Sequence, residues 1–527
     1  MPTAFPYFLL LIRYLGDCKD SKITIGDYCL KPSSQKSFGY DFLKFSPLFG
    51  YNFYKFSPLF GYNFLNIHIF AAYKQLIMKY FKRRIDEALL SWAKSTDRKP
   101  LLLRGARQVG KTSAVRHLGE TFEKFVEIDL NERTDLHSLF APQFSPQQIC
   151  DGLSIATGEK ITAGTTLLFL DEVQACPEAI NKLRYFYEKF PELHLVATGS
   201  LLEFTLENLP SFGVGRIESL YMYPFSFEEF AGATNNNLLF DAIKTASFQN
   251  PLLPVIHEQA IDLLKIFLSI GGMPEVVAMY VKNKNLFDCQ KVLNTLINSY
   301  KTDFVKYRKR IDPALINDVW MSVAEQGHGK FVYSLVNREL RSETIRQALQ
   351  TLVLAGLVYP VVHSSSNGLP LGAEVNRKYS RMIMLDTGIM QRLLNLNLTE
   401  FLLAKDFSTI NKGALAEVFV GTELIKSAPF DSQAELYCWH REDKTGNAEI
   451  DYVTEFDGNV LPIEVKSGTR GSMQSLRLFL TQKKLTQGLR VSLENYSQYD
   501  NISVVPLYAI GCIMKNVSNF RPLGSKL

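Results

Sequence analysis

Three apolar runs, each ending in polar residues, punctuate residues 101–200 of the chain. They occur within KPLLLRG, TTLLFLDEVQ and LHLVATGS. A continuous apolar run of this length is typical of a parallel strand that is covered on both faces. Because an amphipathic helical stretch follows the first run, the pattern predicts an α/β fold with a parallel sheet over residues 78–225.

Helical periodicity then replaces the strand pattern. Apolar residues recur at spacings of three and four through AIDLLKIFLSIGG, which predicts a helical lid over residues 226–305. Residues 306–400 follow, where a short helix, a turn, a helix from Ser342 to Ala355, a stop at Gly356 and an apolar strand form a winged-helix pattern. The last domain is predicted over residues 405–527: residues 405–412 resemble a polar linker, and the domain proper begins near Gly413.

The first 77 residues have a different pattern. KFSPLFGYNF occurs at Lys44–Phe53 and again at Lys55–Phe64, and each copy contains a proline and a glycine that prevent a continuous helix. We predict that the functional fold begins at Met78, where MKYFKRRIDEALLSWAK has the pattern of an amphipathic helix, and that residues 1–77 are translated upstream sequence. The alternative is a dispensable or partner-binding tail.

Composition narrows the class of protein only slightly. The net charge of +5 is spread over 527 residues, so it tolerates a nucleic-acid partner but argues weakly for one. Seven cysteines are scattered singly, which predicts a reducing compartment, the cytoplasm, and no thiolate zinc site. We find no stretch long enough to cross a bilayer, and we expect no membrane partner.

The glycine-rich stretch after the first apolar run carries the most specific chemistry. It fits the pattern GxxxxGK[ST], in which backbone N–H groups and a helix N-terminus face phosphates. The lysine reaches the β and γ phosphates, and the threonine hydroxyl completes a Mg²⁺ shell. We therefore predict a site for ATP and Mg²⁺ at Gly105, Ala106, Arg107, Gln108, Val109, Gly110, Lys111, Thr112 and Ser113.

The ends of the next two apolar runs supply the other half of such a site. Asp171 is predicted to hold Mg²⁺ together with Thr112, and Glu172 to orient or deprotonate the attacking water. In a parallel sheet the end of the third run lies beside the phosphate loop, so Thr198 or Ser200 is expected to sense the γ-phosphate.

Five motifs in combination resemble those of the prokaryotic AAA-like P-loop ATPases, which are related to origin-recognition and signal-transduction ATPases. The motifs are GARQVGKT, LLFLDEVQ, VATGS, GRIESLYMYPFSFEEF and GGMPEVV. These ATPases carry a C-terminal domain of unknown function. The resemblance covers Met78 to about residue 515. Within it, Arg216 could reach a γ-phosphate, from the same chain or from a neighbouring copy in a homo-oligomer, or could be a structural arginine that pairs with Glu218 or a carboxylate of the lid.

The C-terminal domain contains a second candidate centre. In AEIDYVTEFDGNVLPIEVKSG, two predicted strands place Asp451 on the first and Glu464 and Lys466 on one face of the second. Asp451 and Glu464 are candidate Mg²⁺ ligands and Lys466 a candidate for activating water. The segment resembles the PD-(D/E)xK nuclease, or restriction-endonuclease-like, fold, which adds Glu417 as a further ligand. No proline precedes Asp451, and the alternative is a surface ion pair of Glu464 with Lys466.

Two classes of function remain open from the sequence. The first is an ATPase that acts on DNA through its winged helix, with or without a nuclease; the residues expected to face phosphates are Arg338, Arg341, Arg346 and the KYRKR stretch. The second is a regulatory ATPase whose terminal module binds a protein or nucleic acid without chemistry. A third interpretation, a kinase or GTPase, is disfavoured because the chain has no guanine-specifying NKxD motif.

Overall fold

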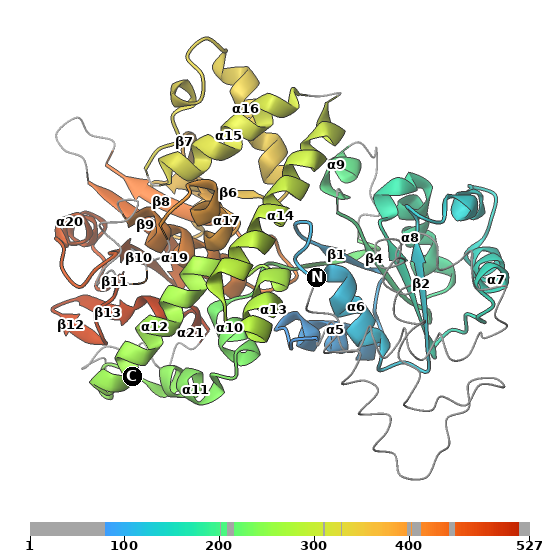
Figure 1. The fold of residues 1–527 in the computed structure, drawn as a ribbon, viewed down its shortest axis with the longest axis horizontal. Coiled ribbons are helices and arrows are strands. Elements are labelled where there is room, and N and C mark those ends of the chain that lie inside the picture. The colour runs from blue at the N-terminus through green and yellow to red at the C-terminus, as the bar shows by residue number, and fades with distance from the viewer. Residues whose placement is uncertain are drawn as a thin grey trace, which may run out of the picture. The chain divides into compact units, whose positions relative to one another are not determined.

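The computed structural model describes residues 80–200, 202–207, 215–308, 311–327, 329–397, 402, 413–441 and 448–515. The repeat of residues 1–77 and the linker of residues 405–412 lie outside the described residues. Residues Tyr80–Leu527 make up one compact unit, and its secondary structure is drawn in Figure 1.

A five-stranded sheet carries the glycine-rich loop. Its strand order is β2-β3-β4-β1-β5, and all neighbouring strands are parallel, which confirms the predicted α/β class. Because β4 lies between β3 and β1, the carboxyl ends of these three strands meet at one edge. The strands are β1 (Leu101–Arg104), β2 (Lys124–Asp129), β3 (Thr166–Asp171), β4 (His194–Thr198) and β5 (Glu218–Tyr221).

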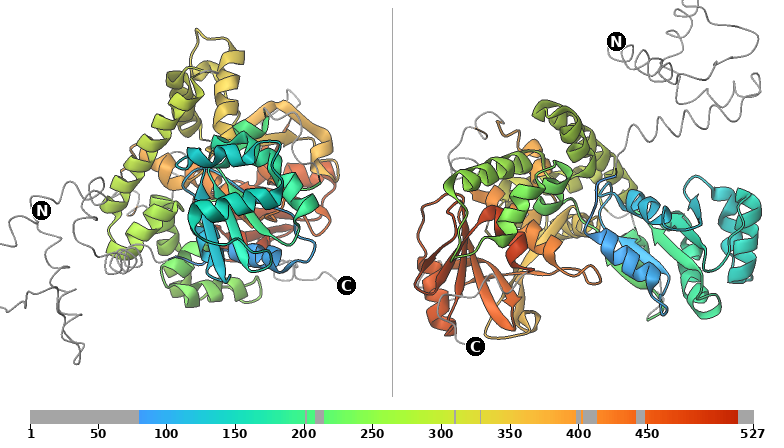
Figure 2. Two further views of the ribbon diagram at one scale, coloured as in Figure 1. Left: turned by 90° about the vertical axis from the view of Figure 1, so that its right-hand side faces the viewer. Right: turned by 90° about the horizontal axis from the view of Figure 1, so that it is seen from below.

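Helices cover both faces of this sheet, as the continuous apolar runs predicted (Figure 2). Leu101 and Leu103 of β1 join one core cluster and Leu102 joins another, because successive side chains point to opposite faces. The first face is covered by α5 (Ile85–Lys94) and α6 (Lys111–Gly119). The second is covered by α7 (Pro146–Thr157) and α8 (Pro177–Lys189).

The first helix begins later than the sequence pattern predicted. It starts at Ile85, whereas we expected it to start at Met78. The residues before Ile85 make polar contacts instead. The Tyr80 side chain and the Arg83 N–H group donate to Asp86, and the Arg83 side chain and the Arg84 N–H group donate to Glu229, which is far away in the sequence. These tertiary contacts outweigh the local helical preference of the segment.

The region after the sheet is helical, as predicted. A short helix, α9 (Leu202–Glu207), precedes β5, and five helices follow it: α10 (Phe227–Ala233), α11 (Asn237–Thr245), α12 (Pro254–Ile270), α13 (Pro274–Asn283) and α14 (Leu286–Phe304). The next helices are α15 (Pro313–Gln326) and α16 (Ser342–Leu354), then the antiparallel hairpin of β6 (Val358–Ser364) and β7 (Val375–Met384), and α17 (Thr387–Leu393). The short helix expected after Gly329 is a single 3-10 turn, Tyr333–Leu335.

An eight-stranded sheet joins this hairpin to the last domain. Its order is β12-β13-β11-β10-β9-β8-β6-β7, and β6 pairs in parallel with β8 across the predicted boundary at residues 400–405. The remaining elements are α19 (Ala414–Ser427), β8 (Leu436–His440), β9 (Glu449–Phe456), β10 (Asn459–Val465), α20 (Gln474–Lys483), β11 (Gly488–Ser492), β12 (Ser497–Tyr499), β13 (Ile502–Pro506) and α21 (Ile510–Ile513).

One hydrophobic core passes through all of these regions. The cluster that contains Leu101 continues through Leu296 of α14 and Leu349 of α16 to Phe419 of α19. The predicted boundaries at residues 225, 305 and 400 therefore do not separate independent cores.

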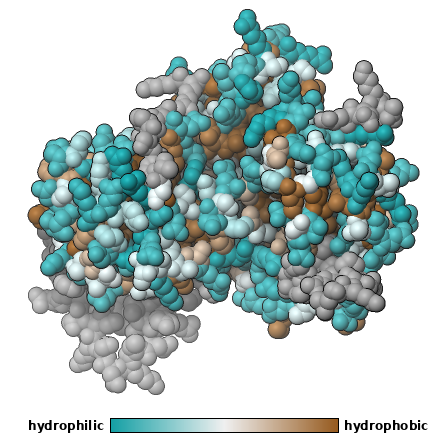
Figure 3. All heavy atoms as spheres, turned by 180° about the vertical axis from the view of Figure 1, so that it is seen from behind, coloured by the Kyte–Doolittle hydropathy of each residue, from teal (hydrophilic) through white to brown (hydrophobic). Residues whose placement is uncertain are grey.

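No helix in the described ranges is long and apolar enough to span a membrane. Hydrophilic residues cover most of the face seen in Figure 3, with smaller hydrophobic patches between them.

Candidate active site

The phosphate loop connects the end of β1 at Arg104 to the start of α6 at Lys111. Lys111 is buried, with 7% of its surface exposed, and its Nζ donates to the carbonyl oxygens of Gly105 (2.9 Å) and Ala106 (2.8 Å). Burial lowers the pKa of this ammonium to about 8, although Glu172 and Asp171 act in the opposite direction. The loop thus surrounds a single cation with backbone dipoles at the position predicted for phosphate binding.

Gly105 is required by the backbone at the start of this loop. Its φ is 138°, and a Cβ at this position would lie 2.1 Å from the carbonyl oxygen of Met222. A side chain is therefore excluded by sterics as well as by conformation. Of the other predicted loop residues, Val109 is fully buried, Gln108 is exposed with a φ of 64°, and Ser113 lies in the first turn of α6.

The first carboxylate, Asp171, ends β3 and lies next to the phosphate loop. Its Oδ2 accepts a hydrogen bond from Thr112 Oγ1 (2.7 Å), and its Oδ1 accepts from Thr198 Oγ1 and from the backbone N–H of Glu172 (2.9 Å). Hydroxyl and carboxylate oxygens are the ligands that Mg²⁺ prefers, so Thr112 and Asp171 fit the predicted metal.

The second carboxylate, Glu172, has left-handed backbone geometry with a φ of 51°, which is unusual for a residue other than glycine. Its Oε2 accepts hydrogen bonds from Gln174 Nε2, from Ser200 Oγ (2.9 Å) and from the backbone N–H of Ser200 (3.3 Å). Burial favours a higher pKa, but these hydrogen bonds and Lys111 outweigh burial and lower the pKa of Glu172 below its usual value. The two hydroxyl residues of the third run thus have separate partners: Thr198 contacts Asp171, and Ser200 contacts Glu172.

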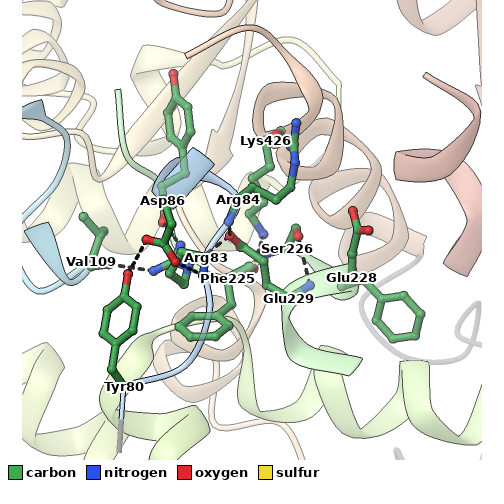
Figure 4. Close-up of polar contacts among 12 residues, drawn as sticks. Tyr80, Arg83, Arg84, Asp86, Val109, Phe225, Ser226, Glu228, Glu229 and Lys426 are labelled. Atoms are coloured by element: carbon green, nitrogen blue, oxygen red, sulfur yellow. Dashed lines mark hydrogen bonds and ion pairs between the residues drawn. The ribbon is translucent and has the colours of Figure 1, made fainter. Parts of the chain in front are cut away.

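Arg83, which the sequence pattern did not single out, contacts the phosphate loop. This buried side chain donates to the carbonyl oxygens of Val109 (3.1 Å) and Tyr223 (2.7 Å) and pairs with Glu229 (3.1 Å) (Figure 4). Its guanidinium also lies over the ring of Phe225, 4.1 Å from the centroid. Arg83 therefore ties the phosphate loop to the first helix of the lid.

A second set of contacts runs from the loop to the helices beyond the lid. The Arg107 side chain pairs with Asp303 near the end of α14, and the Arg107 carbonyl oxygen accepts from Tyr300 Oη (3.0 Å). Gly356, after α16, packs on the loop so closely that a Cβ there would lie 3.2 Å from the Cβ of Ala106. The loop that is predicted to hold phosphate is thus in contact with two later segments of the chain.

Arg216 lies apart from this site. It precedes the first residue of β5, Glu218, which pairs with Leu101 at the amino edge of the sheet, whereas the phosphate loop follows the carboxyl edge. Its side chain pairs with Glu188 of α8 (2.5 Å), not with Glu218 or a carboxylate of the lid. The fold does not bring Arg216 to the phosphate loop of its own chain.

The predicted residues of the C-terminal centre do come together. Glu417 lies on α19, Asp451 on β9 and Glu464 on β10, and Lys466, directly after β10, donates to Glu464 Oε1 (2.5 Å). Arg381 of β7, for which we predicted no role, pairs with Glu417 and with Asp451 (3.3 Å). The sequence feature that could have indicated this residue is the position of Arg381 at the start of the otherwise apolar stretch RMIML.

The carboxyl groups of this centre are buried close to one another. Burial, and then the neighbouring Asp451, raise the pKa values of both Glu417 and Glu464. In the described part of the chain, no group of three or more histidine, cysteine, aspartate or glutamate side chains is arranged to hold a metal ion. The donor set expected for a nuclease metal is present, but a guanidinium lies between two of its members.

Comparison with known families bears on the phosphate loop. Residues 97–231 match the family profile described as AAA domain. This segment is therefore similar to AAA domains. AAA domains are P-loop ATPases, so the match supports ATPase activity and nucleotide binding, typically with Mg²⁺, at the level of the family. Residues 261–400 and 412–510 match two profiles described as Domain of unknown function (DUF8612) and Domain of unknown function (DUF4143). No curated protein is significantly similar to the chain.

Several solved structures are remotely similar. The Walker-type ATPase PABY2304 of Pyrococcus abyssi is 17% identical, with a TM-score of 0.39 over 60% of this chain and 96% of that protein. The ORC1 protein of Aeropyrum pernix in complex with DNA is 12% identical, with a TM-score of 0.25 over 61% of this chain and 93% of that one. A RuvB variant of Thermotoga maritima is 14% identical, with a TM-score of 0.23 over 56% and 93%. With TM-scores this low, none of these similarities informs the function.

Proposed function

We propose that the chain is an ATP-driven switch in which hydrolysis in the AAA domain rearranges a C-terminal half, residues 306–515, that acts on DNA. The observation that carries the proposal is the direct contact of the phosphate loop with Asp303 of α14 and with Gly356 beyond α16. These contacts connect the loop to segments outside the five-stranded sheet.

In this proposal, each residue of the phosphate-binding site has a separate role in ATP hydrolysis. Lys111 exchanges the carbonyl oxygens of Gly105 and Ala106 for phosphate oxygens. Thr112 and Asp171 would hold Mg²⁺, which neutralises charge on the phosphates when it is bound. Glu172, kept ionised by its hydrogen bonds, orients and deprotonates the attacking water.

Coupling follows from the position of Arg107 within the same loop. When Lys111 turns to phosphate, the carbonyl groups of Gly105 and Ala106 lose its hydrogen bonds, and the adjoining Arg107 is connected to α14 at both its side chain and its carbonyl oxygen. A change in the loop therefore shifts Tyr300 and Asp303, and through Gly356 it reaches the segment that follows α16.

DNA is the proposed ligand because of the cations around α16 and the hairpin, which we interpret as a winged-helix module. Arg338, Arg341, Arg377 and Lys378 are all exposed, while Arg346 pairs with Glu343. Exposed cations on such a module can contact phosphates, and each contact makes the slope of log affinity against log salt more negative by about 0.9.

The decisive measurement is the rate of ATP hydrolysis with and without duplex or single-stranded DNA. The parent should be stimulated by DNA. Asp303→Asn removes the charge that pairs with Arg107, so stimulation should fall while basal hydrolysis remains. Asp288→Asn is the matched control, because Asp288 pairs with Lys291 at the other end of the same helix. Equal stimulation of the parent and Asp303→Asn would refute the coupling, and no response to DNA in any protein would refute the choice of ligand.

A role for Arg216 requires a neighbouring copy of the chain, since its own phosphate loop lies at the other edge of the sheet. Its side chain is about half exposed (49%), so it is accessible to a partner. In a homo-oligomer, Arg216→Ala should lower turnover and leave ATP binding intact. Equal loss of both would instead indicate a role in the fold.

A second candidate function is favoured by the position of Arg381. With a guanidinium between Glu417 and Asp451, the C-terminal domain would bind a protein or nucleic acid without cleaving it. Incubation of the parent, Asp451→Ala and Lys466→Ala with plasmid, ATP and Mg²⁺ or Mn²⁺ separates the two. Cleavage by the parent that is lost in both variants would identify a nuclease, and no cleavage by any protein would support the binding module.

A further inference from the structure

Arg381 occupies the middle of the C-terminal centre. Its surface is 3% exposed, and its guanidinium contacts Glu417 Oε2, Asp451 Oδ1 (3.3 Å) and the Asp451 carbonyl oxygen (3.2 Å). Burial lowers the pKa of an arginine, but the carboxylates of Glu417 and Asp451 outweigh burial and raise it. The guanidinium is therefore a permanent cation at this position.

The remaining carboxylate oxygens of the centre are only partly satisfied. Asp451 Oδ2 accepts from the backbone N–H of Val465 (2.7 Å), and Glu464 Oε1 accepts from Lys466. Glu464 Oε2 is buried and has no hydrogen-bond partner among the described residues. Three carboxyl groups face two cations, and Glu464 Oε2 is left without a partner in the described part of the chain, at the place where the nuclease resemblance expects a metal.

A divalent cation in this centre would compete with this guanidinium for the carboxylates of Glu417 and Asp451. Mg²⁺ and Mn²⁺ bind carboxylate oxygens directly at about 2.0–2.2 Å, and a guanidinium that pairs with Glu417 and Asp451 engages one oxygen of each. We propose that Arg381 is the resident cation of the C-terminal centre, and that a divalent metal enters only when its guanidinium is withdrawn.

We expect the Arg381 guanidinium to be withdrawn by movement of the strand that carries it. Arg381 belongs to β7, which is one of the two edge strands of the eight-stranded sheet and packs against α15. Asp451 and Glu464 lie on other strands, β9 and β10. β7 pairs with β6, which begins two residues after Gly356, the residue that rests on the phosphate loop. That the nucleotide cycle moves this hairpin rests on the proposed function. The occupancy of the centre by Arg381 does not.

The test is direct binding of Mn²⁺ to the full chain without nucleotide or DNA, followed by electron paramagnetic resonance. Only binding that Asp451→Asn abolishes is counted, which excludes metal at Thr112 and Asp171. The parent and Arg381→Lys, which keeps the cation, should bind no Mn²⁺ by this criterion. Arg381→Gln should gain a bound Mn²⁺ that is lost in Arg381→Gln/Asp451→Asn.

Two results would overturn the proposal. One is a Mn²⁺ ion in the parent that Asp451→Asn removes, because the guanidinium would then not exclude metal. The other is a folded Arg381→Gln that gains none. Since Arg381→Gln leaves three carboxylates with one cation, Arg381→Gln/Glu417→Gln is measured beside it: this pair removes one charge of each sign and should also gain Mn²⁺. Neither result depends on ATP hydrolysis or on DNA stimulation, so the proposed function can fail separately.

Discussion

Replacing Arg83 by methionine should destabilise the protein strongly. The Arg83 and Glu229 side chains are only 5% and 8% exposed, so their ion pair is sheltered from solvent. Methionine fills similar space but leaves Glu229 charged and buried, with hydrogen bonds from the backbone N–H groups of Arg84 (2.7 Å) and Ser226 (2.8 Å) and no counter-charge. Removing one partner of a buried pair costs about 3–5 kcal/mol. Urea unfolding followed by tryptophan fluorescence measures this loss, with Trp92 on the neighbouring α5 as a local probe.

Two matched variants decide whether the reasoning holds. Arg83→Met/Glu229→Gln removes both charges and should be clearly more stable than Arg83→Met alone, because no lone buried charge remains. Lys82→Met breaks the adjacent pair with Glu87, whose side chains are 79% and 77% exposed, and should change stability little. If Arg83→Met lost no more stability than Lys82→Met, the buried pair would not hold the loop.

The pH dependence supplies an independent check on the same variant. In the parent, burial favours a higher pKa for Glu229, but Arg83 and the two backbone hydrogen bonds outweigh it and lower the pKa below 4.5. The stability from this group is thus present above pH 4.5 and lost as the pH falls through the lowered pKa. Without Arg83, burial raises the pKa and protonation stabilises the fold. The penalty of Arg83→Met should therefore shrink as the pH is lowered from neutral towards 4.5.

Four further predictions concern the AAA-like segment. Lys111→Ala should abolish ATP binding, measured by calorimetry, without lowering the melting temperature; normal hydrolysis would disprove the phosphate-loop assignment. In the parent, ATP affinity should decline above pH 8, where Lys111 loses its proton, and a flat profile between pH 7 and 9 would show that its pKa is not lowered to about 8. Glu172→Gln should bind ATP but hydrolyse it about 10²–10⁴-fold more slowly, whereas Ser200→Ala should raise the pKa of Glu172 and move the acid limb of the pH–rate profile upward.

The parts of the fold that depend on local pattern could be predicted. The strand runs, the loop from Gly105 to Ser113 and the Asp171–Glu172 pair follow from periodicity and from a motif whose residues are close in sequence. The convergence of Glu417, Asp451 and Glu464 required a resemblance to a known fold, because these residues lie on three separate elements.

The contacts that escaped prediction join residues that are far apart in the sequence. Arg83 is 146 residues from Glu229, and Arg107 is 196 residues from Asp303. Arg381 meets Glu417 and Asp451 from a strand of another predicted module. No periodicity reports such pairs, and the same contacts explain why the first helix begins at Ile85 and not at Met78.

The pairing of β6 with β8 determines how this protein can be divided. A protein truncated at residue 400 would keep β6 but lose β8, so its backbone N–H and carbonyl groups would lie at an open sheet edge, which promotes aggregation. A fragment that starts at residue 405 would keep β8 but lose β6, so the edge of β8 that pairs with β6 would be exposed. Cleavage by a protease within residues 403–412 should instead leave two pieces that migrate together until denaturant is added. Expression of either module alone is therefore expected to fail, and assays of the C-terminal domain need the hairpin that contributes Arg381.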